Sequence, residues 1–98
     1  MVKHMIIWKL KEEISDKSGR ASEIKKSLEA LVGKIEGLLE MHILTEGFDS
    51  SSGDIMMDSV FESKEALEAY QAHPAHRAVA VGLVRPSVES RLSFDYEV

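Results

Sequence analysis

The spacing of apolar residues alternates between every second position and every third or fourth, which predicts strands interleaved with helices. Residues 2–10 predict a first strand that is apolar on both faces at its centre. One face carries His4, Ile6, Trp8 and Leu10. The other face carries Met5 and Ile7, because successive side chains of a strand point to opposite sides. A strand with two apolar faces needs a covering layer on each side.

A helical period follows over residues 19–36, where apolar side chains recur three or four positions apart. These positions are Ala21, Ile24, Leu28, Leu31, Val32 and Ile35. Asp16 or Ser18 suits the N-cap, and Gly37 suits the position just after the helix. We therefore expect one long amphipathic helix.

Two further strands are predicted over residues 38–46 and 54–62. The polar segment between them, residues 47–53, begins and ends with glycine, as suits the loop of an antiparallel hairpin.

The remaining elements are a second helical region and a last strand. A helix begins near Ser63, whose hydroxyl can cap it, and must end before Pro74, since the residue preceding a proline disfavours helical geometry. A short helix then runs from Pro74 towards Gly82. Strict alternation over residues 88–96 predicts the closing strand.

The order βαββαβ predicts one α+β domain over residues 1–98, with a ferredoxin-like antiparallel sheet and helices on one face. The helices leave the other face open, where we expect Met5 and Ile7 to lie with Leu39, Met41 and Ile43 of the second strand. Because an apolar patch of that size is unusual on a monomer, we expect a homodimer.

Composition narrows the class of protein. The chain has 98 residues, a net charge of −5 and no cysteine. This charge argues against a nucleic-acid or membrane-surface partner, and the absence of cysteine argues against disulfides and thiolate chemistry. The first residues lack an apolar run long enough for a signal peptide or membrane span, so we expect a cytoplasmic protein.

Candidate chemistry gathers between Tyr70 and His76, which bring a phenol, two imidazoles and a proline into one turn. With Pro74 at the first helical position, His76 falls in the first turn, where free N–H groups disfavour a charged imidazolium. A neutral His76 could act as a general base, or it could simply shape the turn.

Four segments resemble the stress-responsive A/B barrel (Dabb) family. They are residues 2–11 (VKHMIIWKLK), 60–63 (VFES), 70–76 (YQAHPAH) and 92–96 (LSFDY). The resemblance covers nearly the whole chain and implies a dimeric α+β barrel, in which two ferredoxin-like sheets close on each other. The family's function is poorly fixed, and many of its members are known only as stress-induced proteins.

One plant branch of that family consists of polyketide cyclases, which perform an intramolecular aldol condensation without a metal or organic cofactor. By motif, the resemblance implies His4, Tyr70 and His76 as catalytic residues here. Leu28 stands where that branch has a pocket tyrosine, so the same substrate is not implied. Trp8, Ile6, Leu28 and His73 are the expected pocket neighbours.

Structural interpretations stand beside these roles. His4 could be a hydrogen-bonded core histidine, and Tyr70 and Trp8 could be core residues. His73 and His76 lie three apart, but no carboxylate or cysteine accompanies them, so we expect neither a metal nor another cofactor.

Three functions therefore remain open. The first is binding of a small apolar carbonyl compound in a cleft between sheet and helices. The second is a cofactor-independent cyclase or lyase with His76 as the base. The third, by fold analogy alone, is a cofactor-free monooxygenase. A structural stress protein without a ligand is the alternative to all three.

Overall fold

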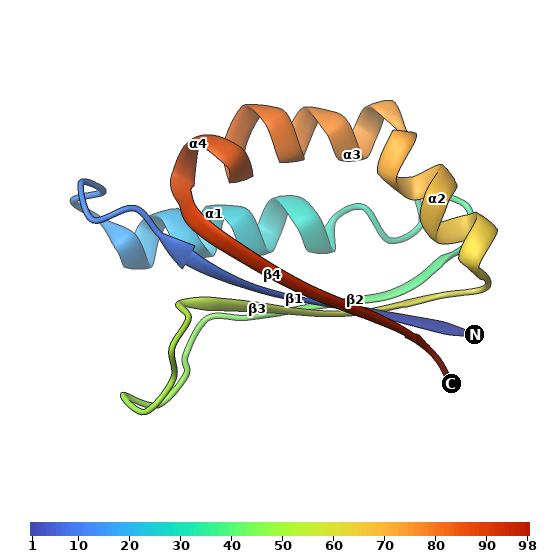
Figure 1. Cartoon of the computed structure of the whole chain (residues 1–98). Helices are drawn as coiled ribbons and strands as arrows, with labels where there is room; N and C mark the ends of the chain where they lie inside the picture. Colours follow the sequence, from blue (N-terminus) through green and yellow to red (C-terminus); the bar gives the residue numbers. More distant parts are fainter.

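A four-stranded antiparallel sheet carries all the helices on one of its faces (Figure 1). The computed structural model describes residues 1–98. The elements in chain order are β1 (Val2–Leu10), α1 (Lys17–Glu29), β2 (Leu38–Leu44), β3 (Ile55–Phe61), α2 (Lys64–Ala72), α3 (Pro74–Val79), the π-helix η1 (Ala80–Val84), α4 (Arg85–Ser87) and β4 (Val88–Glu97). The strand order β2-β3-β1-β4 and the helix placement confirm the ferredoxin-like α+β fold.

The core lies between the helices and the sheet. Ile6, Trp8 and Leu10 of β1 are buried in this core, and they lie on the face that the alternation predicts. Ile24 of α1 and Phe61 of β3 are fully buried against it. Each Å² of apolar surface removed from water contributes about 25 cal/mol to the free energy of folding, so this layer is the main source of stability.

The first helix is shorter than the sequence predicts, because it ends at Glu29 rather than near residue 36. Asp16 is its N-cap and accepts a hydrogen bond from the N–H of Gly19 at 2.9 Å. After Glu29 the chain makes turns through Gly33 and Gly37, which have φ of 89° and 86°. Such left-handed geometry favours glycine and ends the helix. The apolar period persists because the turns still bury Leu31 and Ile35, so periodicity alone does not mark the helix end.

The second helical region is longer than predicted. Ser63 caps α2 through a hydrogen bond from the N–H of Ala66 at 3.1 Å, and the chain bends at Pro74 as expected. It then continues through Gly82 to Ser87. The π-helix η1 comes just before Pro86, which occupies the first turn of α4 and has no N–H to donate. This extension carries the chain back over the sheet to the start of β4.

The face of the sheet without helices, called here the open face, has a different composition from the one predicted. Met41 and Ile43 of β2 are buried on the helix side, because a register shift between Leu38 and Glu40 sets the parity of β2. Leu39, which lies within that shift, is exposed. The prediction was therefore wrong for Met41 and Ile43.

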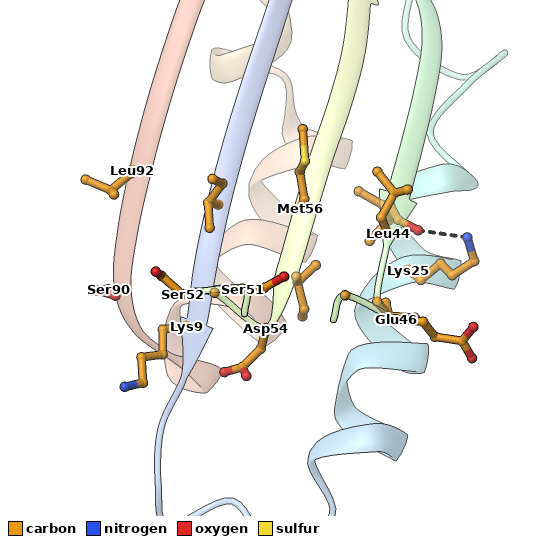
Figure 2. Close-up of a pocket in the computed structure, with 16 residues that line it drawn as sticks. Lys9, Lys25, Leu44, Glu46, Ser51, Ser52, Asp54, Met56, Ser90 and Leu92 are labelled. Carbon is orange, nitrogen blue, oxygen red and sulfur yellow. Dashed lines mark hydrogen bonds between the residues drawn. The ribbon is translucent and has the colours of Figure 1, made fainter. Parts of the chain in front are cut away.

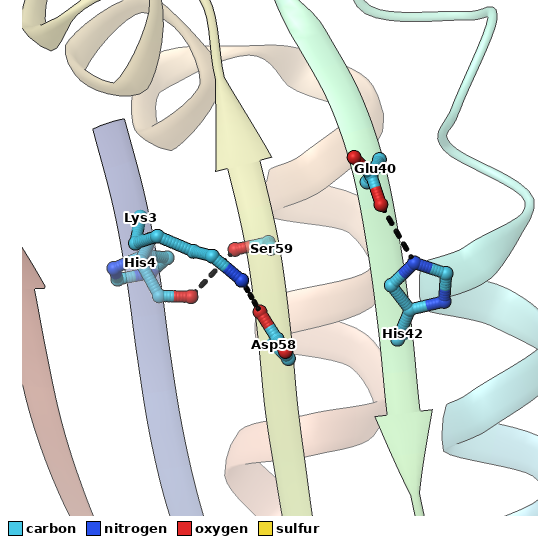
Figure 3. A network of polar contacts seen from close by, with 6 residues as sticks. All are labelled: Lys3, His4, Glu40, His42, Asp58 and Ser59. Carbon is cyan, nitrogen blue, oxygen red and sulfur yellow. Dashed lines mark hydrogen bonds and ion pairs between the residues drawn. The ribbon is translucent and has the colours of Figure 1, made fainter. Parts of the chain in front are cut away.

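The apolar residues of the open face come mainly from β1 and β4. Register places Leu92 beside Ile7 and Phe94 beside Met5. The large exposed side chains on this face are Ile7, Leu44, Leu92, Phe94 and Tyr96. An ion pair between Lys3 and Asp58 at 2.7 Å and a hydrogen bond between His42 and Glu40 at 3.0 Å interrupt this surface (Figure 3).

Candidate functional site

Two cavities border the sheet, and the larger one has no convergent set of reactive groups. It measures about 940 Å³ and lies beside the β2–β3 loop (Figure 2). Two of its charged side chains, Lys25 and Asp54, form hydrogen bonds within the fold. Lys25 donates to the carbonyl of Ile43 at 2.8 Å and to Glu29 at 2.9 Å, while Asp54 accepts from the N–H of Leu10 at 2.8 Å. Size alone is therefore a poor guide to chemistry here.

The smaller cavity, of about 380 Å³, lies between the sheet and the helices and is called here the histidine cavity. Its lining includes six of the seven site residues that the sequence predicts. They are His4, Ile6, Trp8, Leu28, Tyr70 and His76. His4 of β1 and His76 of α3 lie far apart in the chain but meet at this cavity, because β1 lies beneath the helical layer (Figure 1). Cavities of a few hundred Å³ with an apolar lining and few polar groups are typical ligand sites.

His76 enters the cavity from the first turn of α3, where Pro74 and the cap at His73 fix the start of the helix. Its ring lies 4.2 Å from that of Tyr70, centroid to centroid, at an interplanar angle of 40°. The Nδ1 atom of His76 is buried and has no hydrogen-bond partner. An unpaired buried nitrogen is costly, and a ligand with a polar group would remove that cost.

Burial lowers the pKa of His76 below the ordinary value of 6.5. The charges of His4, Arg77 and Arg85 act in the same direction, whereas the backbone carbonyl of Gln71 opposes them. The imidazole is therefore neutral at physiological pH. In that state one ring nitrogen can accept a proton.

Tyr70 stands behind His76 and is 1% exposed. Its ring packs on Phe61 at a centroid distance of 4.8 Å. Burial raises the pKa of Tyr70 well above its ordinary value of 10.0, and the charge of Arg91 opposes that shift. The side chain consequently remains a neutral phenol, which can donate a hydrogen bond to a carbonyl oxygen.

His4 reaches the cavity from the sheet and is 2% exposed. The Nδ1 atom contacts the carboxylate of Asp95, which the register of β1 and β4 places directly opposite. The hydroxyl of Ser59 donates to the backbone carbonyl of His4 at 2.7 Å (Figure 3). With Nδ1 engaged, only Nε2 is left for a ligand. A carboxylate on one ring nitrogen orients a histidine for proton transfer at the other.

His73, the seventh predicted residue, does not line the cavity. Its Nδ1 accepts the N–H of Ala75 at 3.0 Å, so the side chain caps α3. It thereby helps to fix the helix turn that holds His76.

Sequence reasoning missed four polar residues of the site. Gln71, Arg85 and Arg91 line the histidine cavity, and Asp95 holds His4. For Arg91 and Asp95 the signal lay in strand pairing, because these positions of β4 lie opposite Trp8 and His4 of β1. Only the register of these two strands, which are far apart in sequence, reveals that.

Together these groups can bind a carbonyl compound and move a proton. A neutral phenol can donate a hydrogen bond to a carbonyl oxygen, the oriented His4 presents its Nε2 to the ligand, and the unpaired His76 can accept a proton from a neighbouring carbon. The apolar walls exclude water and strengthen such interactions.

Comparison with known proteins assigns the whole chain to one family. A sequence model of the Stress responsive A/B Barrel Domain (Dabb) matches residues 2–98. The Arabidopsis thaliana stress-response A/B barrel domain-containing protein HS1 is 32% identical over 102 residues, which cover 98% of this chain and 88% of that protein.

Solved structures show the same fold. A dimeric ferredoxin-like protein of unknown function from Bacteroides fragilis matches with a TM-score of 0.89 and 26% identity, covering 99% of this chain and 95% of that one. Hydroxynitrile lyase from Passiflora edulis matches with a TM-score of 0.81, covering 99% and 92%. At 17% identity, the likeness to the lyase concerns the fold alone. None of the helices in this chain has the length and apolar character to span a bilayer.

Proposed function

The chain belongs to the stress-responsive A/B barrel (Dabb) family, and on that premise we propose that it binds a small, mostly apolar carbonyl compound in the histidine cavity. The observation that carries the proposal is the unpaired, buried Nδ1 of His76 in a cavity also lined by His4 and Tyr70. Apolar walls would hold the body of the compound. The polar side chains would hydrogen-bond its carbonyl oxygen.

A titration with 1-phenyl-1,3-butanedione, a small β-diketone, tests this binding. Isothermal calorimetry of the wild type should give saturable binding at one site per chain. Leu28→Trp, which adds side-chain volume inside the cavity, should abolish it. Val32→Trp is the matched control, since Val32 is exposed on the same segment of the chain and does not line the cavity. Wild-type affinity in Leu28→Trp would place the binding elsewhere and contradict the proposal.

The second candidate is catalysis of the cyclase or lyase type, with His76 as the general base. It is favoured by the neutral state of His76 and by the position of Tyr70, whose phenol can donate to an enolate oxygen. His4, paired with Asp95 through Nδ1, would add a second donor at Nε2 when its ring carries both protons. In this reaction His76 takes a proton from the carbon beside the carbonyl. The resulting enolate then attacks a second carbonyl or expels a leaving group, and the imidazolium of His76 returns the proton to the new alkoxide or to the leaving group.

Hydrogen–deuterium exchange at the α-carbon of propiophenone isolates the proton-transfer step from any choice of product. We expect the wild type to accelerate exchange in D₂O. The exchange rate with His76→Ala should be about a hundredfold lower, since a general base typically contributes at least that factor to a rate. His42→Ala removes an exposed histidine of the open face and serves as the control. Equal rates in wild type and His76→Ala would exclude His76 as the base. The monooxygenase alternative rests on fold analogy, and no residue of the cavity favours it.

We further propose that the protein is a homodimer whose two open faces pack on each other. The open face exposes five large apolar side chains, more than a free surface of this size usually carries. Its Lys3–Asp58 pair presents both signs of charge, so two copies related by a two-fold axis can be complementary. The similar protein from Bacteroides fragilis is itself described as dimeric.

A further inference from the structure

The charged side chains that line the histidine cavity are all positive, and the one carboxylate beside it, that of Asp95, is engaged by His4. Among its 13 lining residues are Arg85 and Arg91, but no Asp or Glu. This is unexpected in a chain with 17 acidic residues and 12 Lys and Arg. An excess of cations around one cavity of an acidic protein indicates selection of an anion.

Neither arginine is used to hold the fold together. Arg85 and Arg91 are both exposed, and neither takes part in any ion pair or side-chain hydrogen bond of the chain. Arg20 provides the contrast, since its guanidinium donates to the hydroxyl of Ser87 at 2.7 Å and lies 3.8 Å from Glu23. The two cavity arginines therefore keep their donors free for a ligand.

The positions of these arginines fit a ligand with two different ends. Arg85 comes from α4 and Arg91 from β4, on either side of the turn where the helical layer returns to the sheet (Figure 1). Because both are exposed while Trp8 and Leu28 are buried, the charges lie at the rim and the apolar walls lie inside. An acidic group would bind at the rim, and an apolar body would fill the interior.

We propose that the ligand of the histidine cavity is a carboxylic acid, a keto acid whose carboxylate is held by Arg85 and Arg91. This inference rests on the proposed function, because the carbonyl of the same compound would face His4, Tyr70 and His76. Guanidinium groups suit a carboxylate, since their parallel N–H donors match its two oxygens. The charge of Arg85 and Arg91 also reaches the reactive side chains, as the pKa shifts of His76 and Tyr70 reflect.

The test compares 4-oxo-4-phenylbutanoate with its methyl ester, which has the same skeleton without the charge. Calorimetry should show about tenfold tighter binding of the acid to the wild type, because single exposed ion pairs are weak but two act here on one carboxylate. The preference should disappear in the double variant Arg85→Gln/Arg91→Gln, with the affinity for the ester unchanged. Salt should weaken binding of the acid only.

Arg77→Gln is the control, because Arg77 is exposed on α3 but does not line the cavity. It should keep the preference for the acid. Equal binding of acid and ester to the wild type would overturn this inference and leave the proposed function intact. A preference that survives in the double variant would also overturn it. Binding of neither compound would overturn the inference and the proposed function together. Tighter binding of 3-phenylpropyl phosphate than of the acid would contradict the assignment to a carboxylate.

Discussion

At the scale of single residues, His76 and His4 differ in whether their Nδ1 atoms have a hydrogen-bond partner. His4 has its Nδ1 engaged by Asp95, whereas the Nδ1 of His76 is buried without a partner. The cost of leaving a buried polar atom unpaired is about 1–3 kcal/mol. Such an atom beside a cavity lowers stability in the free protein and gains a partner only when a ligand binds.

The lowered pKa of His76 predicts a specific dependence of stability on pH. Above pH 6.5 the imidazole is neutral in the folded and unfolded chain, so it adds no pH dependence. As pH falls through 6.5, the unfolded chain binds the proton first, and the folded state loses stability until the lower folded pKa is passed. We therefore expect the wild type to lose more unfolding free energy between about pH 7 and pH 5 than His76→Gln.

Urea unfolding at a series of pH values measures this difference. His42→Gln, which removes an exposed imidazole, controls for the loss of a histidine as such. Parallel curves for the wild type and His76→Gln would contradict a lowered pKa for His76.

At the scale of elements, the sequence predicts all four strands to within two residues at each end and three of the helix starts. Local signals suffice there, such as the cap at Ser63 and the proline at Pro74. The end of α1 was missed because Leu31 and Ile35 are buried from turns, which continue the apolar period without the helix. The parity of β2 was missed because it depends on a register shift at Leu39 that only pairing with β3 produces.

The same limit applies to the site. Its aromatic and histidine members were predicted from type and motif. The partners Asp95, Arg85 and Arg91 were not, because their role depends on which face of β4 meets β1 and on the extension of the helical layer to Ser87.

The turn after α1 yields a matched pair of glycine substitutions. Gly33 and Gly37 have nearly the same positive φ, of 89° and 86°. A Cβ at Gly33 would meet nothing within 4 Å, whereas one at Gly37 would lie 2.6 Å from the Cβ of Ala66. Gly33→Ala should cost about 1–2 kcal/mol through backbone strain alone. Gly37→Ala should cost a further ~1–3 kcal/mol, because α2 must move away.

Chemical denaturation of the two variants gives both values directly. Equal losses of unfolding free energy would show that α2 does not pack tightly on this turn. A larger loss in Gly33→Ala would contradict the assigned geometry.

At the scale of the whole molecule, the helices cover one face of the sheet and a second copy would cover the other (Figure 1). Leu92 and Phe94 of β4 are 73% and 69% exposed in the single chain. A packed dimer would remove both from water and would protect the long edge strand that carries them.

Charge on this face should separate the proposed dimer. Leu92→Glu/Phe94→Glu should raise the dissociation constant about a hundredfold or more, because both copies carry the two substitutions and the interface would have to bury four carboxylates. Val81→Glu, at an exposed apolar position of the helical layer, should leave the constant unchanged. Sedimentation equilibrium measures all three proteins. A wild type that remains monomeric at high concentration would contradict the homodimer.

The central claim is that the histidine cavity is a ligand site, and the one tryptophan of the chain reports on it directly. Trp8 is buried in the cavity wall, so its indole N–H gives a single resonance in a ¹H–¹⁵N spectrum. During titration with 1-phenyl-1,3-butanedione, we predict a saturable shift of this resonance together with those of His76 and Gln71 backbone amides. Shifts confined to the open face, or no shift at the solubility limit of the diketone, would contradict the claim.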